Sequence, residues 1–320
     1  MTSLDGQVVL VTGATDGMGR ALAAELVREG ATVLVHGRDP RRIADTVAEL
    51  GEARVRSYQA DLADLAQVRA LAERVAEREP RLDVLVSNAG IGSSVPGGGA
   101  RQESADGYEL RFAVNYLAGF ALIRLLLPLL TASAPSRIVN VSSAGQQPID
   151  FSDVMLTSGY DGIRAYCQSK LAQILFTIDL AEHLDGSDVL VNALHPATFM
   201  PTKIVPSPFS TIAEGVAATM HLIADPVGSG DYYNGLREAR ADRQAYDATA
   251  RRQLRELSEK LAGLPPLNEE LARKVSDQER PAGGAPDHRQ PNAGTYRDKL
   301  RAPAAGGIYA LMAVRDSGPP

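Results

Sequence analysis

The 320-residue sequence has no tryptophan and a single cysteine, Cys167. One thiol cannot form a disulfide within the chain, which favours a reducing compartment. The N-terminal residues lack a basic run followed by an apolar run, so they do not predict a signal peptide. The most apolar stretch, Phe120–Leu130, contains Arg124 and Pro128 and is too short to cross a bilayer. We therefore expect a cytoplasmic protein with no membrane span.

The sequence also lacks a basic excess and a metal-binding pattern. Its net charge is −6 and its pI is about 5.5, which argues against a broad electropositive face for nucleic acid. The five histidines have no second ligand at metal spacing, so we predict no metal site. Ser142 and Ser143 lack the Gly-x-Ser-x-Gly context of a hydrolase nucleophile.

Short apolar runs alternate with longer amphipathic segments along most of the chain. This pattern is typical of βαβ units, and nearly all-apolar strands indicate helices on both faces of the sheet. We predict an α/β fold, a Rossmann-type doubly wound parallel sheet of about seven strands in a single domain. The expected strands are Gln7–Thr12, Thr32–His36, Val55–Gln59, Leu82–Ser87, Arg137–Ser142, Val189–Leu194 and Asp231–Asn234, and the expected helices are Arg20–Glu29, Arg41–Leu50, Leu65–Glu79, Tyr108–Leu130, Arg164–Leu184, Thr211–Ala224 and Asp242–Leu261.

The composition changes towards the C-terminus. The segment from His195 to Phe209 is rich in proline and predicts an irregular loop, in which Thr198–Phe209 is expected to form a lid. From Pro265 onwards proline and glycine become frequent and large apolar residues become rare. We therefore predict a folded domain over residues 1–264 and a flexible tail over residues 265–320.

A glycine-rich segment joins the first strand to the first helix. Its glycines stand where backbone can approach a pyrophosphate, whose charge is met by the helix N-terminus. A glycine triplet alone also fits a tight turn, but the position at the start of a βαβ series favours dinucleotide binding. The residues expected to contact the dinucleotide here are Gly13, Thr15, Asp16, Gly17, Met18 and Gly19.

The end of the second strand indicates which dinucleotide binds. A carboxylate there would hydrogen-bond the ribose 2′-hydroxyl of NAD, but this chain has Gly37 followed by Arg38. A guanidinium can hold a 2′-phosphate, so we favour NADP over NAD. Alternatively, Arg38 is a solvated residue before a helix that Asp39 caps.

Further motifs follow this loop in order. Asn88-Ala89-Gly90 follows the fourth expected strand, and Tyr166 and Lys170 form a Tyr-x-x-x-Lys pair. With the Thr-Gly-x-x-x-Gly-x-Gly spacing, these motifs resemble the short-chain dehydrogenase/reductase family, and within it the retinol-dehydrogenase-like and related bacterial reductases. The resemblance implies cofactor contacts from Arg38, Asp61, Leu62, Asn88, Ala89, Gly90, Tyr166, Lys170, Pro196 and Thr198, and catalytic roles for Asn115, Ser143, Tyr166 and Lys170.

Tyr166 and Lys170 are four residues apart and so share one face of a helix. An ammonium and an oxidised nicotinamide beside a phenol favour its ionised form, so we expect the pKa of Tyr166 to be lowered. Tyr166 would then protonate or deprotonate the substrate oxygen, and Ser143 would polarise it. The resemblance implies that Asn115 holds a water in a proton relay from Lys170. Each residue alone is also an ordinary helix or turn residue.

The function favoured by these residues is an NAD(P)(H)-dependent oxidoreductase that interconverts a carbonyl and an alcohol on a small molecule. A non-catalytic dinucleotide-binding protein and a dehydratase or epimerase stay open as alternatives. The segment Ala144–Ile163 carries Phe151, Met155, Leu156 and Tyr160, which either line a hydrophobic substrate pocket or pack the segment onto the body. In the family, helices near residues 108–130 and 164–184 pack between subunits, so we expect a homodimer or homotetramer.

Overall fold

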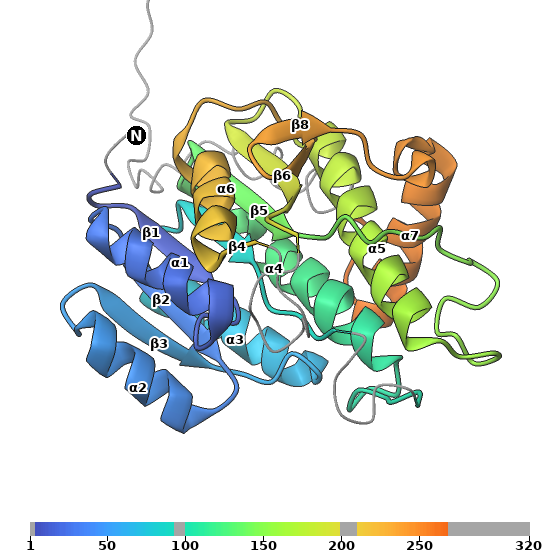
Figure 1. The fold of residues 1–320 in the computed structure, drawn as a ribbon, viewed down its shortest axis with the longest axis horizontal. Helices are drawn as coiled ribbons and strands as arrows, with labels where there is room; N and C mark the ends of the chain where they lie inside the picture. Colours follow the sequence, from blue (N-terminus) through green and yellow to red (C-terminus); the bar gives the residue numbers. More distant parts are fainter. Residues whose placement is uncertain (1–3, 93–99, 199–209, 268–320) are drawn as a thin grey trace, which may run out of the picture. The chain divides into compact units, whose positions relative to one another are not determined.

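The computed structural model describes residues 4–92, 100–198 and 210–267. A single eight-stranded sheet runs through this part of the chain in the order β3-β2-β1-β4-β5-β6-β7-β8 (Figure 1). Adjacent strands are parallel from β3 to β7, and only β8 is antiparallel to its neighbour. The strands are β1 Val8–Val11, β2 Thr32–Gly37, β3 Val55–Gln59, β4 Val84–Ser87, β5 Ser136–Val141, β6 Val189–His195, β7 Tyr232–Asn234 and β8 Arg237–Ala239.

Helices cover both faces of the sheet, which confirms the predicted doubly wound fold. They are α1 Gly17–Arg28, α2 Pro40–Leu50, α3 Leu65–Arg78, η1 Phe112–Leu117, α4 Ala118–Ala132, α5 Gly162–His183, α6 Ile212–Ala224, η2 Arg243–Tyr246 and α7 Ala248–Ala262. Alternate strand residues enter different cores: Leu10 packs with α3, α4 and α5, while Val9 and Val11 pack with α1 and α6. The order of strands reverses between β1 and β4, where a doubly wound sheet opens a crevice at the carboxyl ends.

Aspartates fix where the helices start. Asp16, Asp39, Asp64 and Asp161 each accept a hydrogen bond from a backbone N–H in the first turn of the following helix. Because of the Asp16 cap, α1 begins at Gly17, three residues before the predicted start. Asp39 caps α2, as expected if Arg38 is only a solvated residue before the helix. A cap at Asp39 is equally compatible with cofactor binding by Arg38, so it does not decide the role of that arginine.

The helix predicted over Tyr108–Leu130 is wrong at its start. Glu109 forms an isolated bridge with Glu103, and the chain then makes a π-helical stretch before α4. Together η1 and α4 form an apolar helix, Phe112–Ala132, that is long enough to cross a membrane by length and composition alone. The prediction that the apolar stretch is too short to cross a bilayer is therefore wrong, but 72% of the most apolar window is buried inside the protein. Packing in the core accounts for this apolarity.

The C-terminal helix α7 packs on α5 and is joined to α4 by a buried ion pair. Arg124 on α4 pairs with Glu259 at 3.0 Å, and both side chains are buried. On α5, Asp179 accepts hydrogen bonds from Arg255 at 2.7 and 2.9 Å. The family resemblance implied that these two helices pack between subunits; in this structure α7 of the same chain packs on α5.

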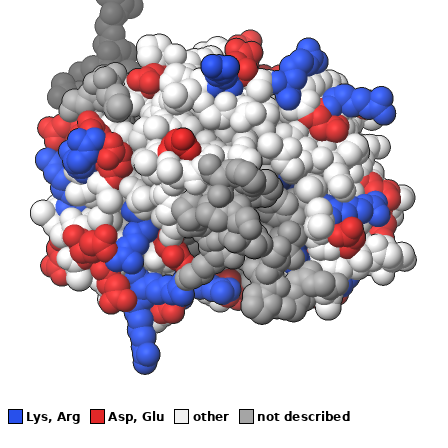
Figure 2. Space-filling model, in the orientation of Figure 1, with Lys and Arg blue, Asp and Glu red and all other residues white. Residues whose placement is uncertain are grey.

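The first residues of the predicted tail belong to the folded body. The carbonyl of Pro265 accepts a hydrogen bond from Arg124 at 2.8 Å, and Leu267 is buried. The rest of the tail lies outside the described residues. On the face drawn in Figure 2, acidic and basic side chains are interspersed rather than gathered into one patch of either sign.

Candidate active site

The glycine-rich loop lies between β1 and α1 and requires small residues at two points. Gly13 has a φ of 67°, which side chains other than glycine rarely adopt. A Cβ atom at Gly19 would lie 2.2 Å from the backbone oxygen of Gly13. Since α1 starts within this loop, its free N–H groups face the crevice. This arrangement fits a bound pyrophosphate.

His36 holds this loop in place and was missed from the sequence. Its Nδ1 accepts a hydrogen bond from the Gly13 N–H at 3.2 Å, and its Nε2 lies 3.2 Å from the carbonyl oxygen of Ala60. These partners require a neutral ring with the proton on Nε2. Burial lowers the pKa of His36 to about 4, so the ring stays neutral at neutral pH. His36 thus connects the loop to the end of β3.

Two arginines lie at the end of the crevice where a ribose 2′-substituent is expected. Arg38 follows Gly37 and is exposed. Arg42, on α2, places its guanidinium 3.2 Å from the carboxylate of Asp16 in the glycine loop. A Cβ atom at Gly37 would come within 2.6 Å of the Thr15 side chain. Only Arg38 could be predicted from the sequence, because the contact of Arg42 depends on the orientation of α2.

The turn after β4 contacts the glycine loop. Asn88 donates from Nδ2 to the backbone oxygen of Thr12 at 2.8 Å, and the Ala89 N–H donates to the Thr12 hydroxyl at 3.0 Å. Beyond the turn, Asn115 accepts from the Ile91 N–H at 2.7 Å and donates to the Ile91 carbonyl at 3.1 Å. The π-helical turn of η1 carries this asparagine. Asn115 therefore fixes the backbone of the turn in this structure.

Tyr166 and Ser143 come together across the carboxyl end of β5. Ser143 follows this strand and Tyr166 lies on α5. A Cβ atom at Gly145 would lie 3.5 Å from the Ser143 hydroxyl oxygen and 3.8 Å from the Tyr166 ring, so the two side chains are neighbours. Burial raises the pKa of Tyr166, although the nearby Ser143 hydroxyl acts in the opposite direction. The protein's own groups therefore do not produce the expected lowering of this pKa, because burial outweighs the effect of Ser143, and the phenol is protonated at neutral pH.

Lys170 lies one helical turn from Tyr166, and its ammonium lies close to the turn after β4. Its ammonium is 5.9 Å from the centre of the Tyr166 ring, and a Cβ atom at Gly90 would lie 3.5 Å from it. Val141 and Gln173 accept hydrogen bonds from Nζ at 2.9 and 3.0 Å. Burial lowers the pKa of Lys170 to about 7. Tyr166, Lys170 and Ser143 thus lie close together at the carboxyl end of β5.

The other predicted cofactor residues have several structural roles. Asp61 accepts a hydrogen bond from the Ala63 N–H at 2.9 Å, after β3. Met18 and Leu62 have buried side chains in the cores, so their side chains serve packing. Pro196 follows β6, and the hydroxyl of Thr198 lies 3.1 Å from His195 Nε2. Residues 199–209 of the predicted lid lie outside the described part of the chain.

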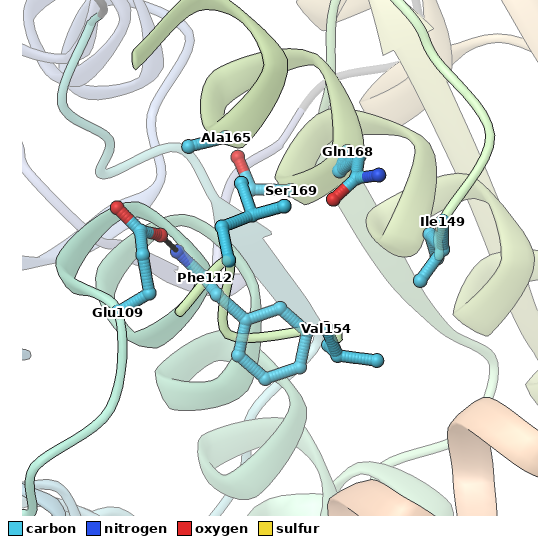
Figure 3. Close-up of a pocket in the computed structure, with 8 residues that line it drawn as sticks. Glu109, Phe112, Ile149, Val154, Ala165, Gln168 and Ser169 are labelled. Atoms are coloured by element: carbon cyan, nitrogen blue, oxygen red, sulfur yellow. Dashed lines mark hydrogen bonds between the residues drawn. The ribbon is translucent and has the colours of Figure 1, made fainter. Parts of the chain in front are cut away.

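The segment between Ser143 and Tyr166 packs onto the body. Leu156 is buried, and the Tyr160 hydroxyl hydrogen-bonds Glu109 at 3.0 Å and Arg111 at 2.7 Å. The small void near Leu156 lies beside Gln168, not beside Tyr166 and Lys170. Figure 3 shows the labelled side chains around this void, which is lined by Glu109, Phe112, Ile149, Val154, Leu156, Ala165, Gln168 and Ser169. For Leu156 and Tyr160, packing onto the body is therefore the better interpretation.

A family model described as short chain dehydrogenase matches residues 7–211. The chain belongs to the short-chain dehydrogenase family. It is 37% identical over 301 residues to human retinol dehydrogenase 14, and the match covers 82% of this chain and 88% of that protein. Mouse retinol dehydrogenase 13 is 38% identical over 290 residues, with 82% and 85% covered. The resemblance predicted from the sequence is confirmed.

Solved structures place the chain among the same short-chain dehydrogenases. An uncharacterised protein from Mycobacterium paratuberculosis superposes with a TM-score of 0.70 at 32% identity, covering 82% of this chain and 96% of that one. The NADP complex of RhlG from Pseudomonas aeruginosa gives a TM-score of 0.60 at 29% identity, with 72% and 95% covered. Membership of this family makes the protein an oxidoreductase of alcohols and carbonyl compounds.

Proposed function

We propose that this short-chain dehydrogenase interconverts a carbonyl and an alcohol on a fairly hydrophobic small molecule with NADP(H), using Tyr166 as general acid and base. The observation that carries the proposal is that Ser143 and Tyr166 lie on the same side of Gly145, with the Lys170 ammonium 5.9 Å from the centre of the Tyr166 ring. A substrate oxygen placed between Ser143 and Tyr166 would receive two hydrogen bonds. The retinol dehydrogenases among its relatives support an apolar alcohol or aldehyde as substrate.

The bound nicotinamide would supply or accept the hydride, and the chain's own residues handle the proton. In carbonyl reduction, Tyr166 donates its phenolic proton to the substrate oxygen as that oxygen gains charge. A protonated phenol is the form needed for this step, and burial keeps Tyr166 in this form. Lys170 stabilises the phenolate that remains. In alcohol oxidation, the same groups act in the reverse direction.

The residues of the crevice fit NADP. The backbone cradle at Gly13 and Gly19 leaves no room for side chains, which suits the close approach of a pyrophosphate. Gly37 would not repel a phosphate on the ribose, whereas a carboxylate at this position would. Arg38 and Arg42 would hold the 2′-phosphate. The exposed pair between Arg42 and Asp16 contributes little to stability, so the guanidinium can exchange one anion for another.

Replacing Arg42 by Ala should weaken NADPH binding by roughly tenfold and leave NADH binding within about twofold, since a charge-assisted contact is worth about 1.5–3 kcal/mol. Isothermal titration with each cofactor measures this difference. Arg41 is the matched control, because it lies in the same helical turn and is also exposed. Equal losses for both cofactors, or an equal loss in Arg41→Ala, would contradict the role of Arg42.

The function itself is tested by following NADPH consumption with a panel of apolar aldehydes and ketones. We expect NADPH-dependent reduction of at least one apolar carbonyl compound, with NADH a poorer donor. Tight NADPH binding without turnover on the whole panel would favour a non-catalytic binding protein. Substrate conversion without net cofactor consumption would favour an epimerase or a dehydratase. A cytoplasmic location and a homodimer or homotetramer stay predictions.

A further inference from the structure

The Lys170 ammonium has a partner that the proposed reaction does not use. Gln173 accepts a hydrogen bond from Nζ through its side-chain oxygen at 3.0 Å, and both side chains are buried. The second acceptor is the Val141 carbonyl at 2.9 Å, at the end of β5. A charged amine that is removed from water requires such acceptors.

The surrounding structure fixes the position of Gln173 on α5. Tyr166, Lys170 and Gln173 occupy the same face of α5, at spacings of four and three residues. The backbone oxygen of Gln173 accepts from the Thr177 hydroxyl at 2.8 Å. Asn140 on β5 in turn donates to that hydroxyl at 2.9 Å. Helix α5 is thereby fixed to β5 directly below Lys170.

In the part of the chain that the structure describes, the neighbours of Lys170 provide no opposite charge. Tyr166 is the titratable group on its own helix, β5 contributes the Val141 carbonyl, and η1 contributes the amide of Asn115 near Gly90. Burial is the single cause that lowers the pKa of Lys170. Among the described residues, two neutral oxygens, those of the Gln173 side chain and the Val141 carbonyl, therefore favour the charged amine and hold it in position.

We propose that Gln173 is a positioning residue that holds the Lys170 ammonium beside Tyr166 and below the turn at Gly90. The inference rests on the proposed function, in which Lys170 must be charged to stabilise the Tyr166 phenolate. The amide oxygen favours the ammonium form without neutralising it. A carboxylate at this position would pair with the ammonium and cancel its field at Tyr166, whereas an apolar residue would favour the neutral amine.

The titration of Lys170 tests this role directly. The chain has only five lysines, so protein labelled with ¹³C,¹⁵N-lysine gives few side-chain signals, and Lys170→Arg assigns the one of interest. In Gln173→Leu, the acid dissociation constant of Lys170 should increase roughly tenfold, because one acceptor of the charged form is lost. In Gln173→Glu, the same constant should decrease by roughly tenfold or more.

Gln168→Leu is the matched control. Gln168 is also buried on α5, but its amide donates to the carbonyl of Pro148 at 2.8 Å, away from Lys170. This variant loses a buried amide as Gln173→Leu does, yet it should leave the titration of Lys170 unchanged. Gln173→Asn withdraws the oxygen by one methylene and serves as the milder variant if Gln173→Leu does not fold, with a smaller change in the same direction.

The pH dependence of kcat/KM for alcohol oxidation provides the second measurement. The alkaline limb that reflects loss of the ammonium should move to lower pH in Gln173→Leu and to higher pH in Gln173→Glu. Coincident Lys170 titrations in wild type, Gln173→Leu and Gln173→Glu would overturn the inference, as would limbs that do not follow those titrations. If wild type turns over no substrate, the proposed function fails, and the labelled lysine still reports whether Gln173 controls the ammonium.

Discussion

Replacing Tyr166 by Phe should lower kcat by roughly 10³-fold, in the range typical for loss of a general acid. The substituted ring keeps its place on α5 and loses only the hydroxyl on the side of Ser143. NADPH affinity should stay within about twofold, because cofactor binding depends mainly on the glycine-rich loop. Steady-state kinetics with the best carbonyl of the panel, together with direct NADPH titration, measure the two effects.

Tyr160→Phe is the control for this substitution. It removes a phenolic hydroxyl of the same kind, but that hydroxyl contacts the buried Glu109 and Arg111 rather than Ser143. Its cost should appear as a lower free energy of unfolding, with kcat reduced far less than in Tyr166→Phe. Turnover by Tyr166→Phe close to wild type would eliminate the proposed proton transfer.

Gly19→Ala should strongly weaken dinucleotide binding. The added methyl would lie 2.2 Å from the backbone oxygen of Gly13 and 2.5 Å from the side-chain Nδ2 of Asn88. The loop must therefore move away from the turn after β4. Strain of this kind costs about 1–3 kcal/mol. Affinity for NADPH should therefore fall by roughly 10- to 100-fold, which fluorescence titration can measure.

Gly51→Ala separates this local effect from a general loss of stability. Gly51 follows α2 with a φ of 84°, and a Cβ atom there would meet nothing within 4 Å. The substitution should lower the free energy of unfolding by about 1 kcal/mol through backbone strain. NADPH affinity should be unchanged. Similar losses of NADPH affinity in the two variants would show that the loop geometry at Gly19 is not what limits binding.

Features encoded in neighbouring residues could be predicted from the sequence. The glycine-rich loop, the Tyr166–Lys170 spacing and the strands β1 to β7 each depend on local patterns. Strand β8 was missed because Arg237–Ala239 is short and has no apolar pattern. Its residues form a strand only because they pair with β7.

Features that depend on distant contacts could not be predicted. The contact of Arg42 with Asp16 spans 26 positions and requires the packing of α2 beside the loop. The protein's own groups raise the pKa of Tyr166, against the expected direction, because the sequence shows the spacing to Lys170 but not the burial. In the same way, the sequence does not show that α7 packs on α5.

The position of α7 has a consequence for how the protein is made. Arg255 and Glu259 fasten this helix to α5 and α4, which a ribosome completes about 70 residues or more earlier. The helix that carries Tyr166 therefore remains uncovered on one side until the nascent chain is well past residue 262. During that interval, a chaperone or another nascent chain has access to a surface that the finished protein hides from both.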